Sequence, residues 1–386
     1  MKKRNLTLWV IFFLLFLLGC SQKPKSNGEE NQTVKKDGSV EENAHLEELQ
    51  SLFESAEKQL TLYAKAKELA EKGKYADAAL VYEKLLKLNN TNPRILLDAS
   101  YAYFDSGNYE KSLEYALKAA EFDTDFKYEI FVEIANSYDM LGESQKAIEY
   151  YKKALKEKPD YNYLYYNLAI TYYRIGNKEK ARMLLKKTLS LEPNMAEAHL
   201  VLGEIYYNDN YTIPALLAYS RVVLIDLKSG KRDLAFERIQ SILMNGVENK
   251  DGNINILFNP EEPEYDGDFS AITLAFNMKK ALDLGEKIIP ENEIDRVSDW
   301  FNTLFTLLEE MQKGNKGFVW EFYVPYFVEM KNKGYVKPFV IILYYKKYPY
   351  AAKSWLDKKE NEKLFEEFAE WDKNYKFKVP DIQVEF

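Results

Sequence analysis

Residues 162–195 read NYLYYNLAITYYRIGNKEKARMLLKKTLSLEPNM, and this stretch decides the fold. It holds two runs with large apolar residues, separated by Gly176, and the second run stops at Pro193. Gly readily takes the left-handed backbone conformation that ends a helix, and Pro is a helix stop signal. The stretch therefore predicts two short helices joined by a tight turn.

The same turn recurs along the chain. Gly73, Gly107, Gly142 and Gly176 are almost evenly spaced, and Asn210 follows at the same interval. Asn is the other residue that tolerates the left-handed conformation at a helix end. A fixed period of about 34 residues with one turn per unit predicts an array of helical hairpins.

Five units align when they start at Gln59, Pro93, Tyr128, Asn162 and Ala196. Their eighth and twentieth positions hold only Ala, Ser or Gly: Ala66, Ser100, Ala135, Ala169 and Gly203, then Ala78, Ser112, Ala147, Ala181 and Ala215. Small side chains are needed where two helices of a hairpin cross closely. Large residues stand between, at the fourth and eleventh positions.

This pattern resembles the tetratricopeptide repeat family, and the third and fourth units match it best. The first, second and fifth units lack the Pro that ends a unit. The resemblance implies an all-α fold, in which a right-handed α-α superhelix over 46–246, with five clear repeats at 59–229, precedes a helical C-terminal domain. His199 occupies a large-residue slot of the fifth unit, so we expect it to pack and not to bind a ligand.

In this family the first helix of each unit lines the concave face, and the resemblance implies a protein or peptide partner there. The residues expected to form this partner-binding groove are Tyr63, Tyr101, Phe104, Asn136, Tyr163, Tyr166, Asn167, Tyr173, Arg174, Glu204 and Tyr207. Tyr and Arg are frequent at binding hot spots. The alternative is that these tyrosines only pack between neighbouring inner helices.

One narrower function is not expected. Members of the family that bind chaperones hold a C-terminal carboxylate with a Lys, Asn and Arg clamp. The matching positions here include Val132, Glu197 and Val201. Without that basic set, the groove does not favour the acidic end of a chain.

The amino terminus has the plan of a secretory signal peptide. Basic residues at 2–4 precede an apolar run, Leu6–Leu18, which is short for a membrane span because a spanning helix needs about 20 apolar residues. Leu17-Leu18-Gly19-Cys20 resembles the lipobox of bacterial lipoproteins, which implies cleavage before Cys20 and a lipid on its sulfur. The alternative is a permanent transmembrane helix.

The lipid on Cys20 would anchor the protein to a membrane outside the cytoplasm. Ser21 favours the outer membrane if the cell is Gram-negative. Residues 21–44 contain three apolar residues, which favours a flexible tether. We therefore expect a signal peptide at 1–19, a lipidated cysteine with its tether at 20–45, the repeats at 46–246 and the C-terminal domain at 247–386.

The C-terminal third shows no repeat and no family that we recognise. Residues 251–268 have loop composition, and Ile256 stands where a calcium-binding EF-hand loop needs Gly. Two apolar stripes, Trp300 to Met311 and Leu364 to Tyr375, predict helices that pack on the last repeat as a cap.

Composition excludes several functions. A net charge of -8 disfavours nucleic-acid binding, and one Cys with two His gives no metal set. No cofactor site or catalytic residue is indicated, because no nucleophile with a base and no Gly-rich phosphate loop is present. We expect a membrane-anchored scaffold or assembly factor of the bacterial cell envelope. The alternatives are a glycan or small-ligand binder, and an enzyme that uses C-terminal acids such as Glu261 and Glu262.

Overall fold

The computed structural model describes residues 38–88, 91–250, 253–257, 262–284 and 293–384. The predicted signal peptide, Cys20 and most of the predicted tether lie outside these residues. The chain divides into two compact units, Met1–Gly142 and Glu143–Phe386. The division falls inside the third predicted repeat, so its two helices belong to different units.

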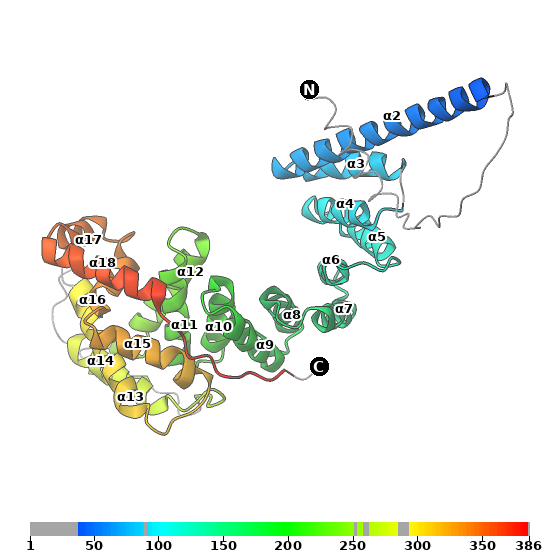
Figure 1. Ribbon diagram of the computed structural model, residues 1–386. Helices are drawn as coiled ribbons and strands as arrows, with labels where there is room; N and C mark the ends of the chain where they lie inside the picture. The colour runs from blue at the N-terminus through cyan, green and yellow to red at the C-terminus, as the bar shows by residue number, and fades with distance from the viewer. Residues whose placement is uncertain (1–37, 89–90, 251–252, 258–261, 285–292, 385–386) are drawn as a thin grey trace, which may run out of the picture. The chain divides into compact units, whose positions relative to one another are not determined.

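Unit 1 consists of antiparallel helices that follow one another along the chain (Figure 1). They are α2 (Gly38–Glu71), α3 (Tyr75–Leu86), α4 (Pro93–Asp105), α5 (Tyr109–Ala119) and α6 (Lys127–Met140). Helix α2 begins at Gly38, so the last residues of the predicted tether, 38–45, are helical and that boundary is corrected. Glu and Ala in this stretch are strong helix formers, which outweighs its low apolar content.

The predicted turns and helix crossings are present in unit 1. Gly73 and Gly107 have φ values of +71° and +83°, which L side chains rarely adopt. Ser100 and Ser112 are fully buried where α4 crosses α5, and their Oγ atoms lie 3.0 Å apart. The small residues therefore sit at the crossing, as predicted.

Unit 2 begins with the remaining repeat helices. These are α7 (Ser144–Glu157), α8 (Asn162–Arg174), α9 (Lys178–Leu191), α10 (Ala196–Asn208), α11 (Thr212–Ile225) and α12 (Gly230–Met244). Gly176 and Asn210 turn the chain with φ values of +82° and +58°. A Cβ on Gly203 would lie 2.9 Å from the Tyr219 ring, which explains why only Gly fits at this crossing of α10 and α11.

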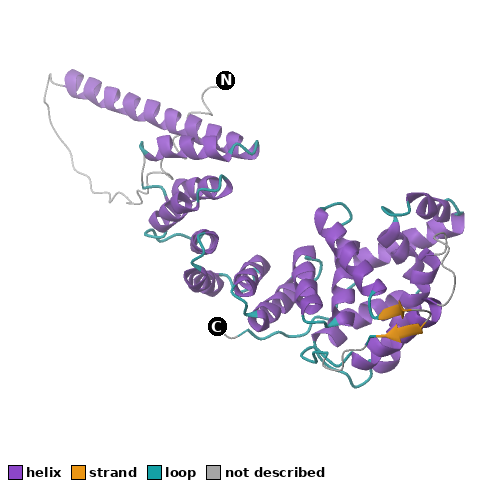
Figure 2. Cartoon of the chain, turned by 180° about the vertical axis from the view of Figure 1, so that it is seen from behind, coloured by secondary structure: helices purple, strands orange, loops and turns teal. Residues whose placement is uncertain are grey.

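A β-hairpin and further helices complete unit 2. Strands β1 (Val247–Lys250) and β2 (Asn253–Ile256) pair antiparallel and are drawn in orange in Figure 2. The helices are α13 (Ser270–Leu284), α14 (Glu293–Met311), the π-helix η2 (Val319–Tyr323), α15 (Val324–Asn332), α16 (Val336–Tyr344), α17 (Pro349–Leu356) and α18 (Lys359–Asn374). Loop composition at 251–268 predicts no strand, and the presence of β2 corrects this prediction. Ile254 and Ile256 favour extended backbone, and they lie opposite Asn249 and Val247 of β1.

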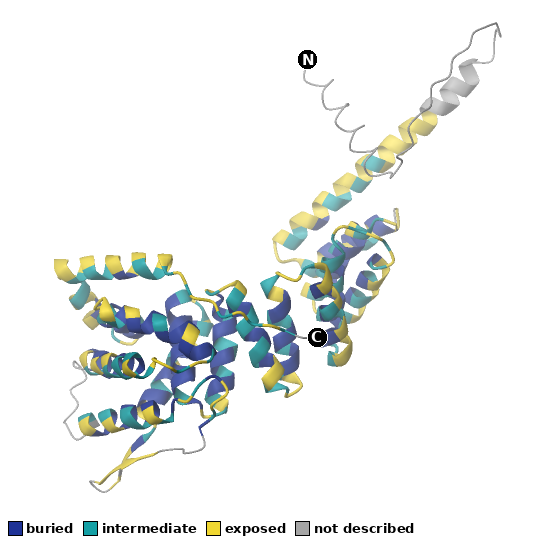
Figure 3. Cartoon of the chain, turned by 60° about the horizontal axis from the view of Figure 1, so that its bottom comes forward, coloured by how far each residue is buried: buried dark blue, intermediate teal, exposed yellow. Residues whose placement is uncertain are grey.

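The C-terminal helices share a core with the last repeats of unit 2. Helix α11 is buried along nearly its whole length and contacts α13, η2 and α16. Trp300, Leu304 and Leu308 of the predicted stripe on α14 are buried, as is Phe368 on α18. Figure 3 shows this buried interior in dark blue and the exposed residues 47–55 of α2 in yellow. Among the described helices, none is long and apolar enough to cross a bilayer.

Candidate functional site

In unit 1 the predicted groove residues occupy the first helices of their repeats. Tyr63 on α2 donates a hydrogen bond to Oδ2 of Asp98 at 2.7 Å. Tyr101 is half-buried on α4, and the Phe104 ring meets Tyr109 edge to face at 5.3 Å. A cavity of about 180 Å³ lies beside Tyr101, with Tyr75 and Tyr82 in its lining.

Carboxyl groups lie beneath this aromatic surface. Glu133 on α6 is 2 % exposed and accepts a hydrogen bond from Oγ of Ser112 at 2.9 Å. Burial raises its pKa to about 7, and the charge of Asp105 adds to the rise, whereas bonds from Ser112 and the predicted groove residue Asn136 oppose it. Glu133 is therefore a buried acid that is only partly ionised near neutral pH.

In unit 2 the predicted residues of α8 form one stripe, because they recur at helical spacing. We call Tyr163, Tyr166, Asn167, Tyr173 and Arg174 the α8 face. Tyr163 is 51 % exposed, Arg174 is exposed, and the others are half-buried. The α8 face thus presents aromatic rings beside a guanidinium group.

On α10 the predicted residues bond within the chain. Glu204 accepts hydrogen bonds from Nε of Arg238 at 2.8 Å and from the hydroxyl of Tyr219 at 2.8 Å. The hydroxyl of Tyr207 lies 2.9 Å from Oγ of Ser241. Arg238 and Ser241 belong to α12, so the carboxylate of Glu204 and the hydroxyl of Tyr207 are hydrogen-bonded to this helix. A role for these two residues in partner binding stays a prediction.

His199 is a packing residue, as predicted. It is fully buried, with Nδ1 at 2.7 Å from the hydroxyl of Tyr323 and Nε2 at 2.9 Å from the carbonyl of Pro193. Burial lowers its pKa to about 3, and the charge of Arg221 acts in the same direction. The imidazole is therefore neutral and links α10 to η2.

Two acids of the loop at 262–269, the catalytic candidate Glu262 and its neighbour Asp266, connect this loop to the repeats. Glu262 accepts hydrogen bonds from the backbone N–H of Thr212 at 3.0 Å and from the hydroxyl of Thr273 at 2.9 Å. Asp266 pairs with Lys186 on α9 and accepts a hydrogen bond from the hydroxyl of Tyr206 at 2.7 Å. These bonds give Glu262 and Asp266 structural roles. Glu261 lies outside the described residues.

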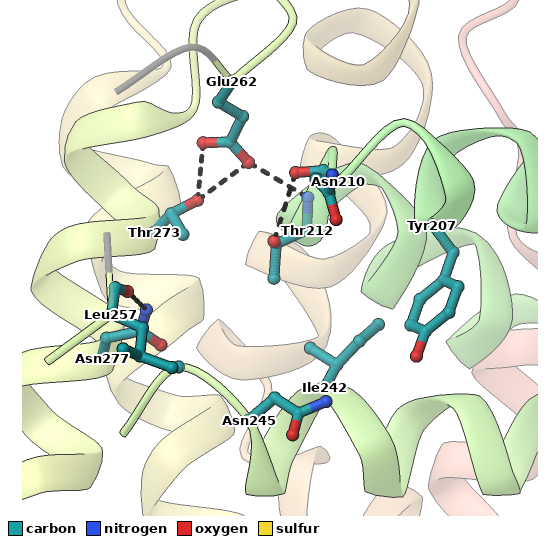
Figure 4. A pocket seen from close by; sticks show the side chains of 10 residues that line it. Tyr207, Asn210, Thr212, Ile242, Asn245, Leu257, Glu262, Thr273 and Asn277 are labelled. Carbon is teal, nitrogen blue, oxygen red and sulfur yellow. Dashed lines mark hydrogen bonds between the residues drawn. The ribbon is translucent and has the colours of Figure 1, made fainter. Parts of the chain in front are cut away.

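Beside Glu262 lies a cavity of about 500 Å³, shown in Figure 4. Its polar lining comes from the α10–α11 turn, the end of α12, the loop and α13: Asn210, Thr212, Asn245, Glu262, Thr273 and Asn277. Tyr207, Ile242 and Leu257 supply apolar surface. The sequence singled out three of these residues for other roles: Tyr207 for the groove, Asn210 for a helix turn and Glu262 as a possible catalytic acid. It gave no sign of the cavity, because no motif connects segments so far apart in the chain.

Part of the chain is similar to known tetratricopeptide repeat proteins. A tetratricopeptide repeat family model matches residues 69–128 and 141–205. The BBSome complex member BBS4 of Bos taurus is 27% identical over 158 residues, which is 41% of this chain and 30% of that protein. The Hsp70-Hsp90 organising protein of Plasmodium falciparum is 26% identical over 153 residues, 38% of this chain and 26% of that protein. The chain thus matches under a third of either relative's length.

Among solved structures, the thermophilic TPR protein TTC0263 of Thermus thermophilus is 21% identical, with a TM-score of 0.41. The match covers 47% of this chain and 99% of that protein. The family match falls on the helical hairpins that turn at Gly73, Gly107 and Gly176, and helices dominate the rest of the described chain. The predicted all-α class is confirmed, and the chain carries tetratricopeptide repeats.

Proposed function

We propose that this protein is a lipid-anchored scaffold of the bacterial cell envelope that holds a protein partner on the inner faces of its repeats. The observation that carries the proposal is the α8 face, where Tyr163 keeps half of its surface exposed. Exposed aromatic residues beside an Arg suit a protein interface, because each ring combines a large contact area with a polar group. One relative is by name an organising protein for two other proteins, which supports a scaffold role.

Binding accounts for the named residues better than catalysis does. Glu262, the acid that lines the cavity, is bonded to Thr212 and Thr273. Asp266 of the same loop is bonded to Lys186 and Tyr206. The tyrosines of the α8 face, in contrast, have exposed surface. In a binding role the repeats contact the partner, and the C-terminal helices support the last repeat.

The test is crosslinking and affinity capture of the full chain in its own envelope membranes. We expect a reproducible protein partner, retained at least tenfold less by a variant with Tyr163→Ala and Tyr173→Ala. Tyr350→Ala is the matched control, because Tyr350 lies on α17 and is 88 % exposed. Equal retention by the double variant and by wild type would refute the use of the α8 face.

The proposed anchor needs a separate test. The lipid would be carried by Cys20, which follows Gly19 at the end of the apolar run. We expect labelled palmitate to enter the wild-type protein, and we expect a Cys20→Ala variant to remain unlabelled and to leave the membrane fraction. A labelled Cys20→Ala protein would contradict the anchor, and the partner experiment would still stand.

A further inference from the structure

The cavity at the end of the repeat array has the size of a small-molecule site. Its volume is about 500 Å³, within the range of about 300–1,000 Å³ that is usual for ligand pockets. Figure 4 shows side chains from α10, α12, α13 and the segments between them around one common space. A cavity of this size has room for one sugar ring with its bound water.

The lining is polar on one side and apolar on the other. The Tyr207 ring, Ile242 and Leu257 offer contact to C–H groups, whereas Asn210 and Asn245 bring amides to the same space. A sugar ring has this combination of a C–H face and a rim of hydroxyl groups. Amide groups suit hydroxyls because each supplies both donors and acceptors.

Two deeply buried polar side chains keep unused hydrogen-bonding capacity. Asn277 is 4 % exposed, and among the described residues its side chain makes one bond, from Nδ2 to the carbonyl of Leu257 at 3.2 Å. Oε2 of Glu262, which is 8 % exposed, accepts a bond only from Thr273 within the described chain. An amide and a carboxylate each have about four bonding positions. The remaining positions are available to a partner in the cavity.

The charge of the cavity lining disfavours anionic ligands. Glu262 is the one charged side chain among the described residues that line the cavity, and it is an acid. The nearby Lys280 bonds to the carbonyls of Ile242 and Asn245, at 3.1 Å and 2.6 Å, and is absent from the lining. A phosphate or a carboxylate would meet no cation here, so a neutral ligand fits best.

We propose that this cavity binds a neutral sugar, as a free monosaccharide or as the end unit of a glycan. The proposal goes beyond the scaffold function, because it uses Asn210, Asn245 and Asn277 and not the α8 face. The hydroxyl groups would bond to the three amides and to Oε2 of Glu262. The C–H face would lie against Tyr207.

The test is saturation-transfer NMR on the full chain with glucose, galactose, mannose and N-acetylglucosamine, and with glycine as a charged comparison. The key variant combines Asn210→Gly with Asn245→Ala. Asn210 has a φ of +58°, which Gly adopts freely, so the turn is kept while the amide is removed. The matched control is Asn255→Ala, at an exposed position of β2 outside the cavity.

We expect at least one sugar to give a saturation signal that the double variant weakens tenfold or more and the control leaves unchanged. Binding of the methyl glycoside as well would identify the end unit of a glycan, and binding of the free sugar alone would identify a monosaccharide. No signal from any sugar, a signal from glycine only, or an unchanged signal in the folded double variant would overturn the proposal. Circular dichroism establishes that the variant is folded.

Discussion

Glu133→Gln should stabilise unit 1, and the gain should grow with pH. Glu133 is buried on α6 against α4 and α5, and its pKa is about 7 where an ordinary Glu has 4.5. Its folded pKa is raised, so the folded state is favoured while the carboxyl keeps its proton. That advantage is lost as the pH rises from 4.5, the ordinary pKa of Glu, through about 7, the pKa of Glu133 in the folded state.

The magnitude follows from the two pKa values. Each pKa unit corresponds to about 1.4 kcal/mol, so the charged carboxylate costs up to about 3 kcal/mol above pH 7. Glutamine resembles the neutral acid in shape and does not ionise in this pH range. The variant should therefore gain about 1 kcal/mol over wild type at pH 5 and about 3 kcal/mol at pH 8.

Hydrogen exchange measured by mass spectrometry is the assay, because it reads local stability in α4 to α6 within the full chain. Wild type and variant are compared at the same pH, so intrinsic exchange rates cancel. Glu114→Gln on α5, whose side chain is 55% exposed, controls for the loss of one charge. A difference between Glu133→Gln and wild type that stays constant from pH 5 to pH 8 would refute the reasoning.

Three further substitutions test the packing of unit 2. Arg221→Ala should cost about 3–5 kcal/mol, because it removes a fully buried guanidinium group that pairs with the half-buried Asp372 and packs on the Tyr326 ring; chemical unfolding followed by Trp fluorescence measures this, and a loss below about 1 kcal/mol would contradict it. Gly203→Leu should lower the melting temperature by several degrees, because its side chain would collide with Tyr219. Asp266→Asn should increase proteolysis of the 262–269 loop by weakening its pairing with Lys186, and an unchanged cleavage rate would argue against that role.

The repeat helices could be predicted because their signals are local. A Gly or Asn at each turn and a small residue at each crossing act within one hairpin, and Gly176, Asn210 and Gly203 lie where the pattern required them. Helix periodicity also predicted that Trp300, Leu304 and Leu308 share the buried side of α14, although burial of that side begins earlier, at Ile294.

The contacts between distant segments could not be predicted. Periodicity puts Glu204 on the inner side of α10, but it does not reveal that Arg238 of α12 reaches it. The cavity joins Asn210 to Asn277, and no sequence spacing indicates that these two residues share a site. The β1–β2 hairpin could not be predicted either, because residues 251–268 have the composition of a loop.

The bond between Arg221 and Asp372 has a consequence for the order of folding. Its partners are 151 residues apart, and Lys186 and Asp266 are 80 apart, whereas the hairpins close over about one repeat. Contacts between distant residues form slowly, because a long loop must close before they form. The repeats can fold early, but one face of α11 stays uncovered until α13, η2 and α16 pack on it, and Arg221 pairs only when Asp372 of α18 arrives. During that interval the apolar surface of α11 needs protection, so α11 is where we expect a chaperone to bind the incompletely folded chain.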